Sequence, residues 1–390
     1  MRRPLRLCYI GWGHSVHTQR WLRWFSNRGH EVFLITNYPA KMAGITEYDI
    51  SHKGTYTASR LKRYPKLEFN VYYINRLKNV FKVRKLVQQI NPDILHLHTL
   101  IYPSYLGLFT GFNSLVISFW NGDIIWTSEG SGSMFRSLII KYGVKKAKLI
   151  TVDSNEMKDM CLKWDDSDSK VEIIQFGVDL NIFNPDIETQ VLRAKLNIGN
   201  NSPVVLSTRS LGKICNIDII IKSIPLVLEG IPSAKFLFTW HAGSEDEYNE
   251  LFELAKDLNI INSVRFVGHL QNHNDLAQYY ALGDVHISIP SHDTTPVSLL
   301  EAMAGGTAPV VGDLPSVKEW IKDSYNGYIV PLKDVKKTAE AITGLLKREP
   351  KRKLFSKRNI EIVREKADYD KEMMKMEELY FSLLTDRDCK

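Results

Sequence analysis

Two carboxylates near the end of a predicted strand could hold one ligand. The segment from Pro290 to Gly312 follows the apolar run DVHISI and carries Asp293 and Glu301, with seven residues between them. This spacing predicts Asp293 on a strand-to-helix loop and Glu301 one or two turns inside the helix, so both acids can face one ligand. A buried glutamate on an apolar helix is costly unless a polar group satisfies it, and paired ribose hydroxyls would do so. The alternative is an ordinary exposed acid on a helix surface.

Two cations follow the first predicted strand of the second half of the chain. Arg209 comes directly after the run PVVLST, and Lys213 lies four residues further along. Two fixed cations at a strand end can hold a diphosphate and stabilise the negative charge that develops as it departs. Solvent-exposed charges on a loop would look the same in a sequence, so the phosphate site is a hypothesis.

A glycine-containing turn follows the first apolar run of the chain. Gly11 and Gly13 stand in the segment GWGHSVHTQRW, where glycines would let backbone amides approach a ligand and the next helix N-terminus would favour an anion. The dinucleotide-binding fingerprint needs a third glycine that is missing here, so we expect no NAD site. Three further side chains could line a ligand site or pack locally: His14, His17 and Arg20.

These segments belong to two series of short apolar runs that alternate with amphipathic stretches. The first series starts at Leu5 and ends with KLITV, and the second starts at Pro203 and ends with GYIVP. Such alternation predicts an α/β fold with two Rossmann-like parallel sheets and crossover helices. Ligands of open parallel sheets bind beyond the carboxyl ends of the strands, so we expect the two domains to face each other across a ligand cleft.

The length of 390 residues suits two domains. We predict an N-terminal Rossmann-like domain over 1–185, completed by about 369–390, and a C-terminal Rossmann-like domain over 190–368. The polar stretch that ends at Asn201 is interpreted as the connection. A hydrophobic content of 44% with 24% charged residues is typical of folded globular proteins and excludes a disordered chain.

The cysteines and the apolar segments indicate an intracellular setting. The four cysteines have no paired spacing, which argues against a disulfide framework and a structural zinc site. No window approaches 18 uninterrupted apolar residues, and the apolar run near the N-terminus is too short for a signal peptide. We therefore expect a cytoplasmic protein.

The positive charge is densest between Lys53 and Lys85. Ten Lys or Arg residues in this stretch face one acid, Glu68, in a chain with a net charge of +7. The stretch would suit an anionic membrane, which would place the protein peripherally at the inner membrane face. A solvated helix face is the alternative. No aromatic-interleaved motif or helix-turn-helix accompanies these residues, so we expect no nucleic-acid partner.

The order of these segments resembles the family-4 retaining glycosyltransferases (glycosyltransferase group 1) over almost the full chain. The matching segments are HTQRWLRWFSNRGHEVFLIT, PDILHLHTL, SFWNGD, ITVDSNEM, FGVDLNIF, STRSLGKICNID, VRFVGHL, PSHDTTPVSLLEAMAGG, GDLPSVKEW and NGYIVP. The resemblance implies the GT-B architecture, in which a last helix, here Met373 to Leu384, crosses back onto the first domain. It also implies a UDP- or GDP-sugar donor bound in the C-terminal domain, an acceptor in the N-terminal domain, and neither metal nor cofactor.

The resemblance assigns roles to several residues of the second domain. Arg209 would contact the diphosphate and Glu301 the ribose. Asp293 stands where the family usually has a glutamate near the donor sugar, and it is one methylene shorter. Cys215 and Asn216 stand where the family has a phosphate-binding lysine and a glycine, so Lys213 would have to replace that lysine.

A further departure lies in the segment SFWNGD. Trp120 stands at the position of a histidine that is proposed to be catalytic in many relatives, and it could stack on a sugar face, while Asp123 remains. The implied catalytic residues are Arg209, Lys213, Asp293 and Asp123. The implied donor-binding residues are Gly11, Gly13, Arg209, Lys213, Asp293 and Glu301. The implied acceptor-side residues are His14, His17, Arg20, Trp120 and Asp123.

We therefore expect a retaining, metal-independent glycosyltransferase that acts on a saccharide or lipid-linked acceptor in cell-surface polysaccharide or glycan synthesis. Two alternatives stay open. A nucleotide-sugar 2-epimerase of the same architecture would release an epimerised sugar nucleotide without any acceptor. A non-catalytic nucleotide-sugar-binding scaffold would explain Cys215 and Trp120.

Overall fold

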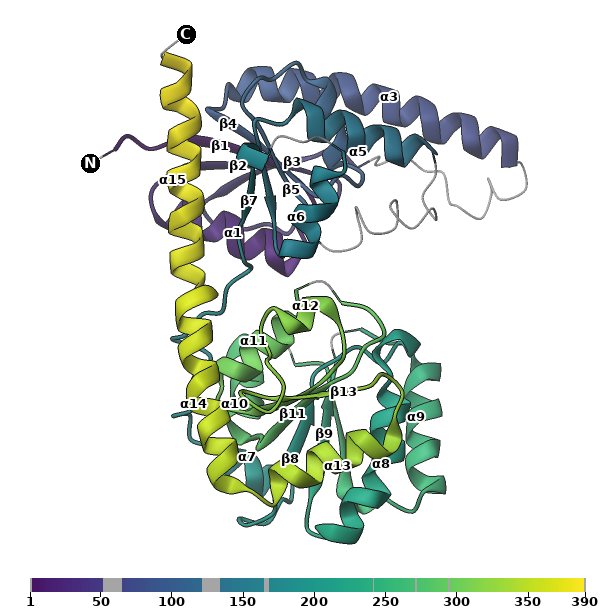
Figure 1. Ribbon diagram of the computed structural model, residues 1–390. Helices are drawn as coiled ribbons and strands as arrows, with labels where there is room; N and C mark the ends of the chain where they lie inside the picture. Colours follow the sequence, from purple (N-terminus) through teal and green to yellow (C-terminus); the bar gives the residue numbers. More distant parts are fainter. Residues whose placement is uncertain are drawn as a thin grey trace. The chain divides into compact units, whose positions relative to one another are not determined.

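The computed structural model describes residues 2–51, 65–120, 134–164, 168–240, 242–270, 272–293 and 295–388. The chain forms two compact units. Unit 1 comprises Met1–Ile174 and Met373–Lys390, and unit 2 comprises Gln175–Glu372. Each unit contains one parallel sheet with helices packed on it (Figure 1). The predicted class of two Rossmann-like α/β domains is confirmed.

The sheet of unit 1 has seven strands in the order β3-β2-β1-β4-β5-β6-β7, all paired in parallel. The strands are β1 (Arg6–Ile10), β2 (Glu31–Thr36), β3 (Ile45–Asp49), β4 (Ile94–His98), β5 (Leu115–Ser118), β6 (Leu149–Val152) and β7 (Val171–Ile173). Every residue of β4 and β5 is buried. Burial on both faces explains why these strands are rich in apolar residues, with His96 and His98 as the polar exceptions in β4.

The helices of unit 1 cover both faces of this sheet. They are α1 (Val16–Asn27), α3 (Pro65–Ile90), the 3-10 helix η1 (Ser104–Phe109), α5 (Met134–Lys146), α6 (Asn155–Leu162), the 3-10 helix η2 (Asp168–Lys170) and, from Met373 on, α15 (Tyr369–Asp388). Ile10 packs in the core shared with α3, η1 and α5. Tyr9 points to the other face, where it contacts Phe25 of α1 and Tyr380 of α15.

The sheet of unit 2 has six strands in the order β10-β9-β8-β11-β12-β13. The strands are β8 (Val204–Ser207), β9 (Lys235–Thr239), β10 (Val264–Gly268), β11 (Val285–Ser288), β12 (Ala308–Gly312) and β13 (Tyr328–Val330). The helices are α7 (Gln190–Lys195), η3 (Lys213–Cys215), α8 (Ile217–Gly230), α9 (Glu245–Asp257), η4 (Ile261–Ser263), α10 (His273–Leu282), α11 (Val297–Ala304), α12 (Pro315–Lys318), α13 (Val335–Leu346) and α14 (Glu349–Lys366). Side chains of α8, α9 and α13 share one core cluster, and those of α7, α10 and α11 share the other.

The strand order reverses at the same place in both sheets. In unit 1 the first strand, β1, lies between β2 and β4, and in unit 2 the first strand, β8, lies between β9 and β11. Chain connections leave such a strand pair in opposite directions, which opens a crevice at their carboxyl ends where ligands bind. Gly11 and His98 lie at this point of unit 1, and Arg209 and Asp293 follow the corresponding strands of unit 2.

The last helix returns to unit 1. Tyr380 of α15 is fully buried, and its hydroxyl lies 3.1 Å from the hydroxyl of Tyr9 and 2.5 Å from Nδ1 of His96. Glu377 forms an ion pair with Arg28 (2.9 Å) and a hydrogen bond with Nε2 of His30 (2.8 Å). Partial burial alone would raise the pKa of Glu377, but hydrogen bonds and charges from Arg28 and His30 lower it overall. The predicted return of Met373 to Leu384 onto the first domain is confirmed.

Two further features bear on the setting of the protein. Within the described ranges, no helix has both the length and the apolar character needed to cross a bilayer. Cys8, Cys161 and Cys215 are buried free thiols, and burial raises the pKa of Cys161 to about 12. Cys389 lies outside the described residues.

Candidate functional site

Arg209 and Asp293 meet at the carboxyl edge of the unit 2 sheet. Nη1 of Arg209 lies 2.9 Å from Oδ2 of Asp293 and 3.3 Å from Oγ of Ser298 on α11. The side chains of Arg209 and Asp293 are only 19% and 10% exposed. Burial alone would lower the pKa of Arg209, but the charge of Asp293 and then the thiol of Cys215 raise it overall. The structure therefore holds a permanent cation in a largely desolvated position.

Glu301 lies beside this pair at the end of a buried hydrogen-bond chain. Its side chain is on α11, and the residue is 8% exposed. The hydroxyl of Tyr280 donates to Oε2 of Glu301 at 3.2 Å and lies 2.9 Å from Oγ1 of Thr208. Thr208 directly precedes Arg209. The interpretation of Glu301 as an ordinary exposed helix acid is therefore wrong.

Tyr280 and His286 extend the site beyond the residues found in the sequence. Both are fully buried, and Nε2 of His286 lies 3.4 Å from Oγ1 of Thr208. Burial, with a smaller contribution from Arg209, lowers the pKa of His286 to about 3, so the imidazole is neutral at pH 7. Burial and the charge of Glu301 raise the pKa of Tyr280, so its hydroxyl keeps its proton. A histidine inside the apolar strand DVHISI was the available signal.

Cys215 and Asn216 have local explanations. Burial raises the pKa of Cys215 even though Arg209 lowers it, so the thiol is neutral and adds no cation. Asn216 has a left-handed backbone with φ 52°, which asparagine tolerates better than most residues where relatives have glycine. Its Nδ2 donates to the carbonyl of Ile289 and to Oγ of Ser291, at 2.8 and 3.0 Å. Asn216 thus fixes the loop that leads from β11 to Asp293.

Lys213 begins η3, and its side chain is exposed. No hydrogen bond or ion pair joins this side chain to another part of the described chain. Its amine is therefore open to solvent, unlike the guanidinium of Arg209. Whether it takes the place of the lysine missing at Cys215 stays a prediction.

Gly11 and Gly13 use their amides inside unit 1. The amide of Gly11 donates to the carbonyl of Ile35 at 3.3 Å, and that of Gly13 donates to Oγ1 of Thr36 at 3.1 Å. A Cβ at Gly13 would lie 2.5 Å from the carbonyl oxygen of Tyr38. The glycine at position 13 is thus explained by backbone packing, and in this conformation neither amide is directed to a phosphate.

The acceptor-side residues divide into two groups. His17 and Trp120 come together, with ring centroids 6.2 Å apart, and Trp120 also lies 4.3 Å from His98. His14 is exposed and stacks on Trp12 instead. Arg20 is half-buried on α1. Asp123 lies outside the described residues.

His98 is the member of this cluster that the sequence analysis missed. It ends β4, it is 2% exposed, and its Nδ1 lies 3.3 Å from Oγ1 of Thr18. Burial, reinforced by His96 and His17, lowers its pKa well below the ordinary value. Two histidines alternating with leucines in the strand ILHLH were the available signal.

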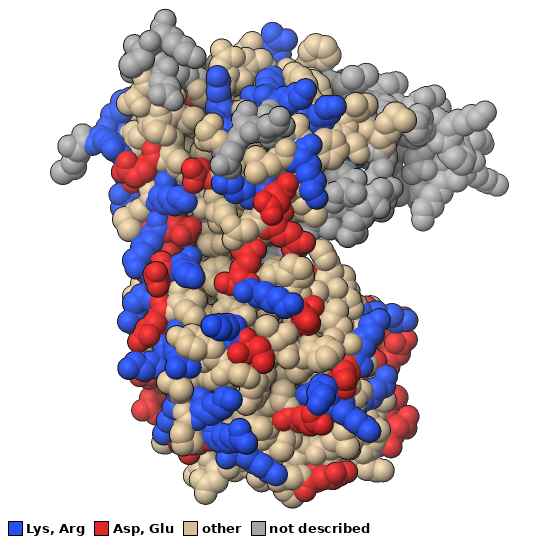
Figure 2. Space-filling view, in the orientation of Figure 1, with Lys and Arg blue, Asp and Glu red and all other residues tan. Residues whose placement is uncertain are grey.

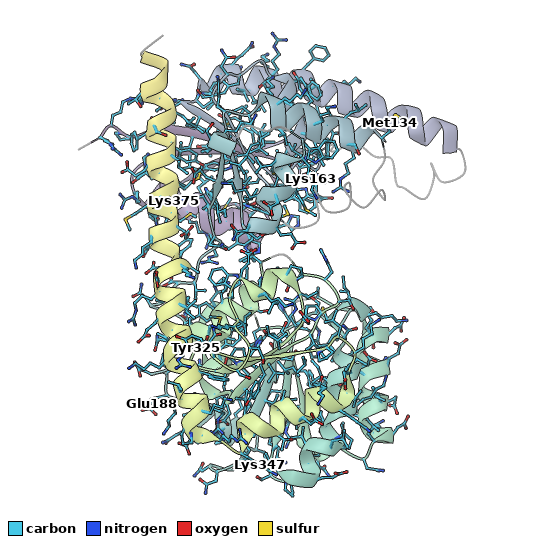
Figure 3. The ribbon with its side chains drawn as sticks, viewed as in Figure 1. Met134, Lys163, Glu188, Tyr325, Lys347 and Lys375 are labelled. Atoms are coloured by element: carbon cyan, nitrogen blue, oxygen red, sulfur yellow. The ribbon has the colours of Figure 1, made fainter. Side chains whose placement is uncertain are left out.

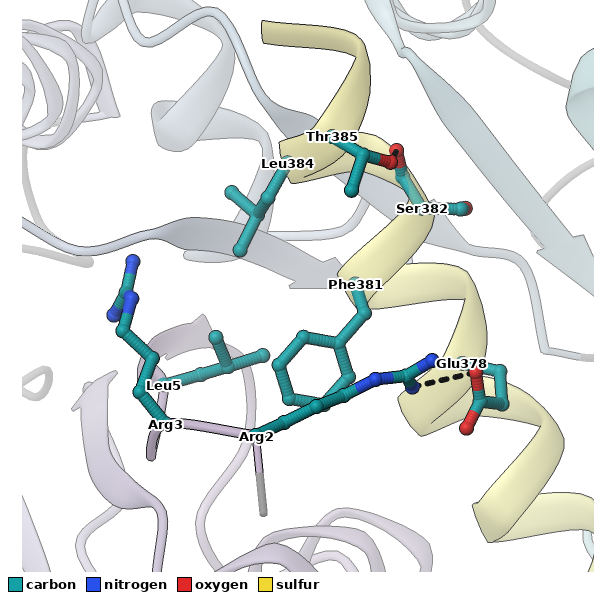
Figure 4. Close-up of a pocket in the computed structure, with 8 residues that line it drawn as sticks. All are labelled: Arg2, Arg3, Leu5, Glu378, Phe381, Ser382, Leu384 and Thr385. Carbon is teal, nitrogen blue, oxygen red and sulfur yellow. Dashed lines mark hydrogen bonds and ion pairs between the residues drawn. The ribbon is translucent and has the colours of Figure 1, made fainter. Parts of the chain in front are cut away.

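Potential metal ligands and the pocket along α15 were also compared with the predicted site. Among the described residues, no three His, Cys, Asp or Glu side chains gather as potential metal ligands. A pocket of about 480 Å³ lies along α15 in unit 1 (Figure 4). Arg2 crosses it to Glu378 at 2.6 Å and covers the ring of Phe381. These contacts anchor the two ends of the chain and include no residue predicted for the site.

Comparison with known proteins gives matches along most of the chain. The model of the glycosyl transferases group 1 matches residues 188–361, and that of the glycosyl transferase 4-like domain matches residues 6–154. A relative from Bacillus anthracis, N-acetyl-alpha-D-glucosaminyl L-malate synthase, is 22% identical over 366 residues, which cover 93% of this chain and 91% of the relative.

Solved structures show the same fold. A glycosyltransferase from Rickettsia africae ESF-5 has a TM-score of 0.79 at 14% identity, covering 98% of this chain and 99% of that one. Anabaena Alr3699/HepE in complex with UDP and glucose has a TM-score of 0.76 at 15% identity, covering 97% and 100%. The GT-B fold expected from the sequence is confirmed. With one family model over each unit and this fold throughout, the chain belongs to the group 1 glycosyltransferases of family 4.

Proposed function

We propose that this glycosyltransferase transfers a sugar from a UDP- or GDP-sugar to a saccharide or lipid-linked acceptor, with retention of anomeric configuration and without a metal. The observation that carries the proposal is the buried arrangement of Arg209, Asp293 and Glu301 at the strand-reversal point of unit 2. The UDP and glucose named with the Anabaena structure support a uridine nucleotide as the first donor to test. Cell-surface polysaccharide or glycan synthesis is the setting that the family resemblance suggests.

The charges at this site suit a sugar diphosphate. Arg209 is fully charged, but Asp293 neutralises part of its field at 2.9 Å. A diphosphate therefore needs the remaining N–H groups of the guanidinium and a second cation. Lys213, four residues further along the chain, has an amine open to solvent. Glu301 is held by Tyr280 so that a carboxylate oxygen can accept from ribose hydroxyls. Asp293 would accept from hydroxyls of the donor sugar.

The chemistry needs no protein nucleophile. The bond from the anomeric carbon to the diphosphate oxygen breaks, and its electron pair stays on that oxygen. The acceptor hydroxyl oxygen bonds to the anomeric carbon on the same face, and its proton passes to the departing diphosphate. Arg209 and Lys213 would stabilise the negative charge that develops on the leaving group. Trp120 and His17 of unit 1, whose rings lie together, are proposed to contact the acceptor, with His14, Arg20 and Asp123 as further acceptor-side residues.

Two parts of the proposal concern other sites. Gly11 and Gly13 are proposed to lie near the donor phosphates. Their amides already donate to groups of unit 1, so these two residues would pack against the donor without a hydrogen bond from their amides. The basic 53–85 segment is proposed to contact an anionic membrane. Side chains are described only from Lys78 on, and Lys78, Lys82, Arg84 and Lys85 are all exposed.

The experiment begins with a screen of UDP-, GDP- and ADP-sugars for thermal stabilisation, because a ligand that binds only the folded state raises the unfolding midpoint. The stabilising donor is then incubated with saccharide and polyprenyl-phosphate-linked saccharide acceptors, and the anomeric configuration of the product is read by NMR. We expect transfer with retention. Inversion would contradict the mechanism, an epimerised sugar nucleotide formed without acceptor would indicate the epimerase, and donor binding with no turnover would indicate a scaffold.

A further inference from the structure

Helix α5 has two apolar faces, and only one of them is covered. Ile139, Ile140 and Val144 are buried in the core of unit 1. On the opposite side, Met134 and Leu138 are 81% and 59% exposed. A surface helix normally presents charged and polar residues on the side away from the core. The exposed apolar face of α5 therefore calls for a physical explanation.

The exposed face forms a continuous stripe. Met134, Leu138 and Tyr142 follow one another at intervals of four residues, so they lie above one another on the helix. Lys141 and Lys145 are also exposed and fall on the same stripe at intervals of three and four. Figure 3 labels Met134 at the start of α5. The stripe thus combines three large apolar side chains with two amines.

Helix η1 extends the stripe with a further aromatic ring. Phe109 is 42% exposed, and its ring stacks on that of Tyr142 at 6.0 Å with an interplanar angle of 14°. Lys146 donates to the carbonyl of Leu108 and lies 5.6 Å from the centre of the Tyr142 ring. These contacts hold the two rings side by side at the surface. We call the set Phe109, Met134, Leu138, Lys141, Tyr142 and Lys145 the α5 surface.

Helices η1 and α5 and the described side chains of α3 carry charge of one sign. Helix α5 and η1 contain no acidic residue, and neither does α3 from Lys78 to its end at Ile90. η1 contacts both α3 and α5, which lie near each other in Figure 1. The α3 segment adds four exposed cations and the exposed ring of Phe81. On the face of this unit that Figure 2 presents, Lys and Arg side chains border uncharged surface, and Asp and Glu side chains are present too.

Exposed apolar side chains combined with amines favour one class of partner for the α5 surface over others. A second copy of the chain docked by the same face would set lysines against lysines, which is unfavourable. A small soluble anion would satisfy the amines but leave the apolar side chains in water. An anionic lipid surface satisfies both, because headgroup phosphates attract the amines while the apolar side chains enter the boundary of the acyl chains.

We propose that the α5 surface binds the protein to anionic lipid. This surface is formed by η1 and α5, and it differs from the basic 53–85 segment, whose described side chains, from Lys78 on, are the adjacent cations of α3. It extends the proposed function by giving unit 1 a defined face on which to meet a lipid-embedded acceptor. The binding itself does not depend on catalysis.

The test uses the full chain and sedimentation with vesicles of phosphatidylcholine alone or with 30% phosphatidylglycerol. The variant Leu138→Glu/Lys141→Glu removes one apolar side chain and reverses one charge of the stripe. Its matched control, Val191→Glu/Lys195→Glu, makes the same two changes at exposed positions four residues apart on α7 of unit 2. Each replaced cation near an anionic surface accounts for several-fold in affinity, so we expect at least about a tenfold weaker partition for the α5 variant.

We expect the wild type and the α7 control to bind anionic vesicles, to bind phosphatidylcholine weakly, and to lose binding as salt rises. No binding by the wild type, or equal binding by the α5 variant and the control, overturns the proposal. Dimerisation of the wild type in size-exclusion chromatography with light scattering, abolished by the α5 variant and unaffected by vesicles, would assign the face to a second copy instead. Donor-induced thermal stabilisation, measured without vesicles, reports on the proposed transferase function separately.

Discussion

Tyr280→Phe removes one hydroxyl and preserves the ring that packs in the core of unit 2. The lost hydroxyl joins two buried groups, Oε2 of Glu301 at 3.2 Å and Oγ1 of Thr208 at 2.9 Å. Because Tyr280 is 0% exposed, water does not readily replace it. Loss of a hydrogen bond to a buried charged group costs about 1.5–3 kcal/mol. We expect the free energy of unfolding to fall by about that amount, which lowers the unfolding midpoint by several degrees.

The same change should weaken donor binding. Without Tyr280 the carboxylate of Glu301 loses its fixed orientation, and we expect the Kd of the nucleotide sugar to rise by roughly tenfold, or about 1.4 kcal/mol. Calorimetric titration and thermal unfolding measure the two effects. Tyr279→Phe is the matched control, because Tyr279 is 5% exposed on the same helix and makes no hydrogen bond to Glu301 within the described structure. Wild-type affinity and stability in Tyr280→Phe would refute the positioning of Glu301 by this hydroxyl.

Three further predictions concern stability and are read by thermal or urea unfolding. The pKa of Glu377 is lowered in the folded state, so its contribution to the free energy of unfolding is present above the ordinary pKa of 4.5 and is lost as pH falls through the folded pKa. Arg28→Met should reduce this loss of stability at acid pH. An unchanged dependence of stability on pH would contradict the ion pair. Gly13→Ala would place a Cβ 2.5 Å from the carbonyl oxygen of Tyr38 and should destabilise unit 1 by about 1–3 kcal/mol; wild-type stability would show that the turn relaxes. Asn216→Ala loses two side-chain hydrogen bonds at a left-handed position and should cost about 2 kcal/mol, whereas no cost would contradict its role in holding the loop.

The sequence predicts the fold well because parallel sheets buried on both faces leave a strong pattern. Runs such as DILHLH and PVVLST are rich in apolar residues and fully buried along their strands, and amphipathic helices separate them. The sequence also identifies Arg209 and Glu301 as candidate site residues, because a charged residue directly after a buried strand or inside an apolar helix is unusual. Their contacts cannot be predicted from the sequence. Arg209 and Ser298 are 89 positions apart, and no local pattern specifies that they meet.

Other features of the site escape the sequence for definite physical reasons. Tyr280 resembles an ordinary core aromatic, and only the structure shows where its hydroxyl is directed. A sequence does not distinguish a glycine needed for a ligand from one needed for backbone packing. It therefore predicts Gly13 near a phosphate, whereas the structure explains this glycine by the carbonyl oxygen of Tyr38. Asn216 stands where the resemblance predicts a glycine, and the structure places it in the left-handed region with φ 52°. Asparagine and glycine are the residues that adopt this conformation most easily.

The central claim is that unit 2 binds the donor through Arg209 and Glu301, and calorimetric titration of Glu301→Ala with the stabilising nucleotide sugar tests it most directly. Glu229→Ala, at an exposed position of α8, is the control. Loss of two hydrogen bonds from ribose hydroxyls to a buried carboxylate predicts a Kd about 100-fold higher for Glu301→Ala and an unchanged Kd for the control. An unchanged Kd for Glu301→Ala, in a variant that unfolds as cooperatively as the wild type, would contradict the assignment of the donor site.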